Sequence, residues 1–318
     1  MTRLGAVLAL ALWLAGNGPA AARDVIVEAQ SGRTLDLAQL ADAVRRSDYA
    51  LLGERHDNAE HHARRGELIR ALGGRGSVVA EHLERGRHFA PGAIGNGGKG
   101  HEGAEGGEGN ALEAALVAAG FDPKGWRWPL HRPLFAAVAE SHLPLAGGNI
   151  ARELARRIVQ EGAAAVPPEL AALRARAPLG AQAQARQDAD QIAGHCGMLT
   201  PERLPGHRLA QRTRDAAMAE ALLAQTRKPA LLLAGNGHVR LDYGVPTLLA
   251  QLAPGAKVVV VGFVESGDEL ADARRDGLYT HLWLGAPAAR EDPCAALLKT
   301  GLPPAGGKPV SSQAPTQP

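Results

Sequence analysis

Four apolar segments of this chain each end in a cluster of carboxylate, imidazole or amide side chains. The segments are residues 49–53, 77–80, 143–147 and 230–234, and the polar residues that follow them are Glu54, His56, Glu81, His82, Asn149, Asn236 and His238. A carboxylate and an imidazole that are neighbours can act as acid and base, or can share a metal ion. Two of the clusters have the form Gly-x-x-His, at residues 53–56 and 235–238. This repetition favours a functional site.

The elements that position these residues alternate between strand-like and helical segments. The short apolar runs are typical of buried strands, whereas residues 35–46 and 58–72 have the apolar spacing of helices. This alternation predicts an α/β fold, with a mostly parallel sheet and helices on both of its faces. Residues 24–28 are expected to add a short edge strand.

In an open parallel sheet, ligands bind beyond the carboxyl ends of the strands. We therefore expect four residues to lie side by side in one crevice, with Asn149 and Asn236 beside them: Glu54, His56, Glu81 and His238. Simple helix capping would explain Asp57, Asn58 and Asn149 equally well. His61 and His62 are adjacent on the following helix, so one of the two is expected to face solvent.

A long helical segment separates the third strand from the fourth. Residues 150–226 are rich in Ala, Arg and Gln, and together with residues 111–142 they predict a helical cap over the strand C-terminal ends. The segment is interrupted at residues 194–201, where His195, Cys196 and Met198 lie close together. His, Cys and Met are all axial ligands of haem iron, so this break is a candidate haem wall, with an ordinary loop as the alternative.

Composition and termini limit the class of protein. The 318 residues carry a formal net charge of +2, which favours neither nucleic acid nor an acidic membrane surface as a partner. Residues 1–22 have a basic start, an apolar run and a small-residue end, as in a cleaved secretory signal. Residues 23–302 then form a single α/β domain, and residues 303–318 are expected to be a disordered tail. Export would permit a disulfide between Cys196 and Cys294, although both could equally stay free.

Several blocks between Tyr49 and Val264 resemble one family. They are LLGERHDNAEHH, VVAEH, WRWPLHRPLF, GGNIARELA, HCGMLTPERLP, QRTRDAAMAEAL and LLLAGNGHVRLDYGVP. In order and spacing they resemble the ChaN-like haem-binding lipoproteins, which belong with the Tiki and TraB proteins in one superfamily. The resemblance implies an α/β core with a cap that holds haem, and an extracytoplasmic role in bacterial haem or iron uptake. It also implies other haem-uptake components as partners, with a homodimer as one arrangement for sharing the haem.

The chain departs from this family pattern in two ways. Asn17 stands where the lipidated cysteine would be, so we expect an exported periplasmic or outer-membrane-associated protein without a lipid. At residues 128–131 the chain lacks the tyrosine of a family-like aromatic block. The haem candidates are His195 as first ligand and His131 as second, with Met198 as a soft ligand. Trp128 is a candidate for stacking on the porphyrin, with packing under the cap as the favoured alternative.

A second function stays open beside haem binding. In the Tiki branch, the positions that match Gly53, Glu54, His56, Glu81, Gly235 and His238 are linked with metal-dependent peptide hydrolysis. The alternative is thus a metal-dependent hydrolase, a peptidase or esterase, whose divalent metal is held by Glu54, His56, Glu81 and His238. Haem binding without catalysis is the interpretation that we put first.

Overall fold

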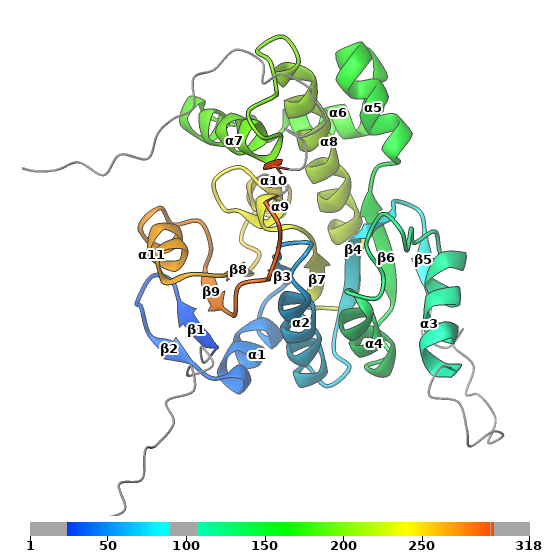
Figure 1. Cartoon of the computed structure of the whole chain (residues 1–318), viewed down its shortest axis with the longest axis vertical. Helices are drawn as coiled ribbons and strands as arrows, with labels where there is room; N and C mark the ends of the chain where they lie inside the picture. The colour runs from blue at the N-terminus through cyan, green and yellow to red at the C-terminus, as the bar shows by residue number, and fades with distance from the viewer. Residues whose placement is uncertain (1–23, 90–106, 293, 296–318) are drawn as a thin grey trace, which may run out of the picture.

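The computed structural model describes residues 24–89, 107–292 and 294–295. The predicted leader and the whole predicted tail lie outside the described residues. The described chain forms a nine-stranded sheet with the order β2-β1-β9-β8-β3-β7-β4-β6-β5, flanked by helices on both faces (Figure 1). The predicted fold class is confirmed.

The middle of the sheet is parallel and its edges are antiparallel. The parallel strands are β3 (Tyr49–Leu52), β4 (Ser77–Glu84), β6 (Leu145–Asn149), β7 (Ala230–Leu233), β8 (Val258–Val264) and β9 (His281–Leu284). The antiparallel strands are β1 (Val25–Glu28), β2 (Thr34–Leu35) and β5 (His88–Phe89). The strand expected at residues 24–28 is present as β1, but it is not the edge strand, because β2 pairs with its free side and forms the edge itself.

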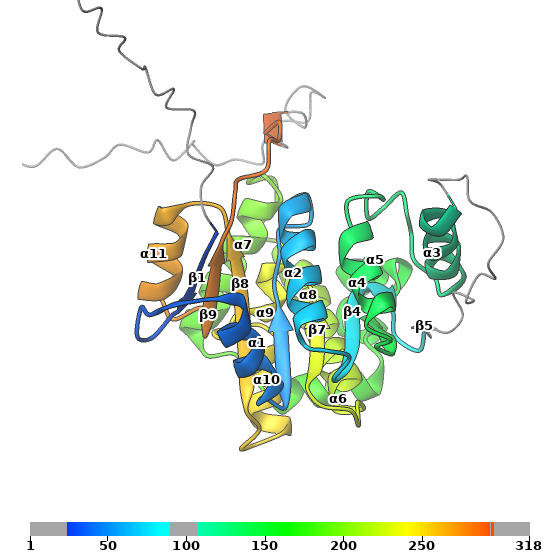
Figure 2. The ribbon, with the colours of Figure 1, turned by 90° about the horizontal axis from the view of Figure 1, so that it is seen from below.

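Helices α1 (Leu37–Arg45), α2 (Ala59–Ala71) and α4 (Arg132–Glu140) lie side by side on one face, and α3 (Gly107–Ala118) lies outside them (Figure 2). Asn58 caps α2 by accepting hydrogen bonds from the backbone N–H groups of Glu60 and His61. Residues 111–142 were predicted to belong to the cap, but α4 packs along α2 on the face of the sheet. The part of this segment that lies at the strand ends is the turn before α4.

The other face is covered mainly by α8 (Leu204–Leu223) and α10 (Val245–Leu252), with the single turn α9 (Asn236–Val239) after β7. Helix α11 (Gly267–Arg275) packs beside β9. Beyond the C-terminal strand ends stand α5 (Arg152–Glu161), η2 (Gly162–Ala165), α6 (Pro168–Ala175), α7 (Ala181–Gly194) and the first turns of α8 (Figure 1). This group of helices is the cap over the sheet.

A disulfide joins the cap to the C-terminal segment. Cys196 lies two residues after the end of α7 and pairs with Cys294, with 5.5 Å between the two Cα atoms. The two cysteines whose state the sequence left open are therefore bonded to each other. None of the described helices combines the length and apolar character needed to cross a membrane.

Candidate functional site

Two neighbouring residues of strand β4 belong to two different polar clusters. The strand continues past Ala80 to Glu84, and its register against β6 shifts over that stretch. Successive side chains of a strand point to opposite faces. Glu81 accordingly contacts His238 on the α8 face, whereas His82 packs against His131 and Phe135 on the α4 face. The interpretation of Glu81 and His82 as one acid–base pair at a strand end is therefore wrong.

The first cluster, called the Glu54 cluster here, consists of Glu54, His62, Arg65, His82 and His131. All five side chains are at most 1% exposed. Glu54 follows β3, His62 and Arg65 lie on α2, and His131 precedes α4. Glu54 forms an ion pair with Arg65, and its Oε2 lies 2.8 Å from Nδ1 of His62. Its Oε1 lies 3.7 Å from Nε2 of His82 and 3.9 Å from Nε2 of His131.

Burial keeps the imidazoles of this cluster neutral. It lowers the pKa of His62 to about 4 and the pKa of His131 to about 2, and it holds the pKa of His82 well below its usual range. Burial also lowers the pKa of Arg65 to about 9, which leaves the guanidinium charged at neutral pH. The Glu54 cluster thus contains one buried ion pair and three neutral imidazoles whose lone pairs can bind a ligand.

The second cluster, called the Glu81 cluster, consists of Glu81, Asp215 and His238. Nδ1 of His238 lies 2.6 Å from Oδ1 of Asp215, and its Nε2 lies 3.4 Å from Oε1 of Glu81. Burial disfavours the imidazolium, yet the two carboxylates raise the pKa of His238 to about 10. Burial likewise disfavours the Glu81 carboxylate, but His238 and the backbone N–H of Gly235 hold its pKa well below the usual range. His238 is therefore a cation between two anions at neutral pH.

His56 lies between the two clusters and faces solvent. Its Nδ1 is 2.6 Å from Oε1 of Glu54, so a neutral ring donates that N–H to the carboxylate and leaves Nε2 as an acceptor. A cavity of about 470 Å³ in front of His56 is lined by five of the six residues predicted for the crevice: Glu54, His56, Glu81, Asn236 and His238. The structure thus brings these residues together at the strand ends.

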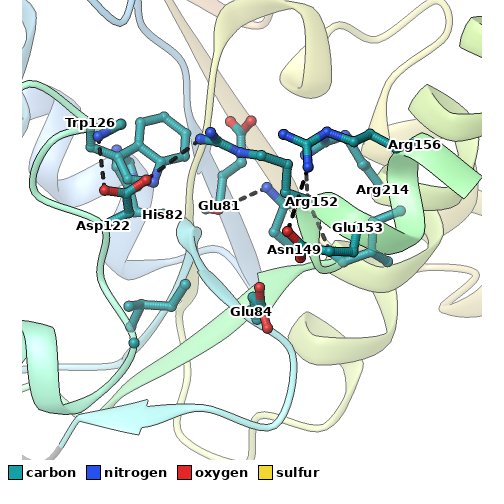
Figure 3. A pocket seen from close by; sticks show the side chains of 14 residues that line it. Glu81, His82, Glu84, Asp122, Trp126, Asn149, Arg152, Glu153, Arg156 and Arg214 are labelled. Atoms are coloured by element: carbon teal, nitrogen blue, oxygen red, sulfur yellow. Dashed lines mark hydrogen bonds and ion pairs between the residues drawn. The ribbon is translucent and has the colours of Figure 1, made fainter.

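Asn149 lines an adjoining cavity of about 480 Å³, which shares Glu81 and Arg214 with the first. Figure 3 shows Asn149 between Glu81 and Arg214: its amide donates to the carbonyl of Glu81, and its oxygen accepts from Arg214. Asn236 is also held by its neighbours, because its side chain exchanges two hydrogen bonds with the backbone of Phe263. Both amides fix the backbone around the site.

A third candidate site, called the cap groove, lies between α5, α7 and α8. Its cavity of about 600 Å³ has His195, His207, Ala155, Val159 and Ala210 in its wall, with Arg152, Arg156, Arg203 and Arg214 among the other lining residues. The rings of His195 and His207 meet edge to face with 4.6 Å between centroids. Nδ1 of His195 is 2.7 Å from the carbonyl oxygen of Gln191. Since a carbonyl only accepts, Nδ1 carries the proton and Nε2 of a neutral His195 is free to bind a ligand.

The other three residues predicted to hold haem lie elsewhere. His131 is 1% exposed inside the Glu54 cluster and is not among the described residues that line the cap groove. Trp128 packs edge to face on Phe121, with 5.7 Å between the rings. Met198 lies two residues after the disulfide-bonded Cys196 and is not among the described residues that line the cap groove.

Several residues of these sites were missed from the sequence. Both His61 and His62 are fully buried, because Phe263 covers one ring and His131 the other. The expectation that one of them faces solvent is wrong. Asp215 and Arg65 could have been noticed as charged residues on apolar helix faces, and His207 as a second histidine near His195 in the cap.

Comparison with known proteins gives one family and one clear likeness of fold. The family described as "Haem-binding uptake, Tiki superfamily, ChaN" matches residues 40–249. The solved structure "Cofacial heme binding to ChaN of Campylobacter jejuni" aligns with a TM-score of 0.63 and 20% identity, over 82% of this chain and 96% of that chain. The structure of the type III effector HopBA1 aligns with a TM-score of 0.38 and 11% identity, over 79% of this chain and 94% of that one. No curated protein matches the chain.

Proposed function

Because the chain belongs to the ChaN family of haem-binding uptake proteins in the Tiki superfamily, we propose that it binds haem in the cap groove. The observation that carries this placement is the orientation of His195. Its Nδ1–H is fixed by the carbonyl of Gln191, so that Nε2 is the free ligand atom in a cavity of about 600 Å³. Ligand pockets of small molecules and cofactors typically have volumes of roughly 300–1,000 Å³.

The residues around His195 fit the two chemical parts of haem. Ala155, Val159 and Ala210 offer an apolar surface to the porphyrin, and the arginines of the groove offer partners for the propionates. When bound, the haem would supply an iron that accepts an imidazole nitrogen. His207 is the second candidate ligand, since its buried Nε2 has no hydrogen-bond partner among the residues that the structure describes.

A haem titration followed by absorption spectroscopy tests this proposal. We expect a Soret band in the wild type, and at least a tenfold loss of affinity in His195→Ala, equivalent to about 1.4 kcal/mol. His142→Ala is the matched control, because His142 is exposed and lies just before β6, at the opposite end of the strands from the cap. A wild type that gives no haem spectrum refutes haem binding. Unchanged spectra in both His195→Ala and His207→Ala refute the cap groove as its place.

The cellular part of the proposal concerns haem uptake outside the cytoplasm. The predicted signal at residues 1–22 supports export, and the chain would then act in the periplasm or at the outer membrane. N-terminal sequencing of the mature protein from a periplasmic fraction tests it, with Arg23 as the expected first residue. Light scattering of the haem-loaded protein tests whether haem is shared within a homodimer, which would double the mass on loading.

Metal-dependent hydrolysis remains the second candidate function. The observation in its favour is the Glu54–His56 pair, in which the carboxylate orients an imidazole whose Nε2 faces a cavity. Such an arrangement suits a general base or a metal ligand. Ester and peptide substrates, assayed with and without a chelator, test it. Activity that survives in His56→Ala would remove this assignment.

A further inference from the structure

We infer that the Glu54 cluster is a binding site for a divalent transition-metal ion, with Glu54, His62 and His131 as ligands and His82 as a fourth. One potential ligand atom from each of the first three residues lies within 4.8 Å of the other two. These side chains lie on the α2–α4 face of the sheet and are separate from the cap groove. The inference therefore stands whether or not the protein binds haem.

The distances in the cluster are close to those of a tetrahedral site. Ligand atoms that lie at about 2.0–2.2 Å from a tetrahedral zinc ion are roughly 3.3–3.6 Å apart. Oε2 of Glu54 lies 2.8 Å from Nδ1 of His62, and its Oε1 lies 3.7 Å from Nε2 of His82 and 3.9 Å from Nε2 of His131. Both carboxylate oxygens of Glu54 thus lie within 4 Å of imidazole nitrogens that could share one ion with them.

The hydrogen bonding of the cluster also requires a cation. Nε2 of His62 lies 3.1 Å from the carbonyl oxygen of His56, so Nε2 carries the proton and the Nδ1 lone pair faces the Glu54 carboxylate. Two acceptors at 2.8 Å repel each other unless a positive charge lies against both. In addition, neither ring nitrogen of His82 or of His131 has a hydrogen-bond partner within the described parts of the chain. Buried polar atoms without a partner are rare in native proteins, and a missing ion is one explanation.

Arg65 is the cation that meets this need in the structure. Its Nη2 is 2.7 Å from Nδ1 of His62 and forms the ion pair with Glu54. A metal ion would use the same lone pairs, so Arg65 competes with it. Removing the guanidinium charge should therefore tighten metal binding, whereas removing an imidazole should weaken it.

The donor set indicates which ions would bind. Two or three imidazoles with one carboxylate suit zinc, iron, cobalt or nickel, whereas magnesium and calcium prefer oxygen ligands. The ligands differ from those of the hydrolase alternative in His62, His82 and His131, and share only Glu54. The two assignments can thus be separated by substitution.

The experiment is a titration of chelator-treated, haem-free full-length protein with Co²⁺, followed by the d–d absorption of cobalt and by calorimetry. We expect one Co²⁺ per chain in the wild type, with the intense visible bands of a tetrahedral site. His131→Gln and His62→Gln should each bind at least about tenfold more weakly. Arg65→Met should bind at least about tenfold more tightly, because a like charge is removed from beside the ion. His238→Gln, in the Glu81 cluster, should bind as the wild type does.

Two outcomes would overturn the inference. If neither the wild type nor Arg65→Met binds Co²⁺, the Glu54 cluster is a buried ion-pair network and not a metal site. If binding is lost in His238→Gln and kept in His131→Gln, the metal belongs to the cavity in front of His56. Circular dichroism of each variant shows that it is folded, and His82→Gln replaces any histidine variant that is not.

Discussion

The Glu54–Arg65 pair makes a strong prediction about stability. Both side chains are 0% exposed, so each charge is desolvated and depends on the other. Removing one partner of a buried ion pair typically destabilises a protein by about 3–5 kcal/mol, because an uncompensated charge is left in the interior. We expect Glu54→Gln to fall in this range. Nη2 of Arg65 would keep only the neutral His62 as a partner, and its Nε and Nη1 have none among the described residues. Arg65→Met should cost less, because His56 still donates to the carboxylate.

The double variant Glu54→Gln/Arg65→Met separates pairing from packing. Because it removes both charges, its loss of stability should be smaller than the sum of the single losses by about 2–3 kcal/mol. Urea denaturation followed by circular dichroism, with a chelator present to exclude metal, measures the three free energies of unfolding. The matched control is the exposed pair Arg70–Glu140, whose coupling should be under about 1 kcal/mol. Losses that add within about 0.5 kcal/mol at Glu54 and Arg65 would refute the reasoning.

Three further predictions follow from the structure. The Cys196–Cys294 bond closes a loop of 98 residues. Its reduction should lower the free energy of unfolding by at most about 4.7 kcal/mol. In urea denaturation, Cys196→Ser should be as stable as the reduced wild type. Although burial opposes ionisation, Arg290 and Asn58 lower the pKa of Glu265 to about 2. The ionised carboxylate therefore contributes its full stability above pH 4.5, and this contribution is lost as the pH falls toward 2. In Glu265→Gln, the melting temperature should depend less on pH between these values. Gly147→Ala should lower the melting temperature, because its Cβ would clash with the backbone carbonyl oxygen of Glu84. Gly267→Ala, whose Cβ would meet no atom within 4 Å, should not.

Local sequence signals were sufficient for the central strands. The apolar run before Glu54 and the one before Gly235 each coincide with a parallel strand, because uninterrupted apolar runs fit strands that are buried on both faces. Asn58 was one of two predicted caps, and its side chain does accept from the first turn of α2. These features depend on a few adjacent residues and need no tertiary information.

Features that depend on tertiary contacts could not be predicted. Strands β2 and β5 have two residues each and are too short to show a period. Asp215 lies on α8 and reaches His238 only because that helix packs across the sheet, a contact with no local signal. His61 is buried because β8 supplies Phe263 against it, although the helix pattern alone would leave it exposed.

The alternation of β4 explains why two unrelated kinds of chemistry lie at one end of the sheet. One residue step along the strand sends Glu81 toward α8 and His82 toward α4, so the two side chains meet different partners. The charge of Glu81 still acts on Arg65 and His82, but the charges that act on His238 are those of Glu81 and Asp215. On the α8 side, two carboxylates stabilise the imidazolium of His238. On the α4 side, burial keeps His82 neutral beside the Glu54–Arg65 ion pair. Removing the charge of Arg65 should therefore leave the protonation of His238 nearly unchanged. NMR titration of the His238 ring in Arg65→Met would contradict this separation if the pKa moved by more than about 1 unit.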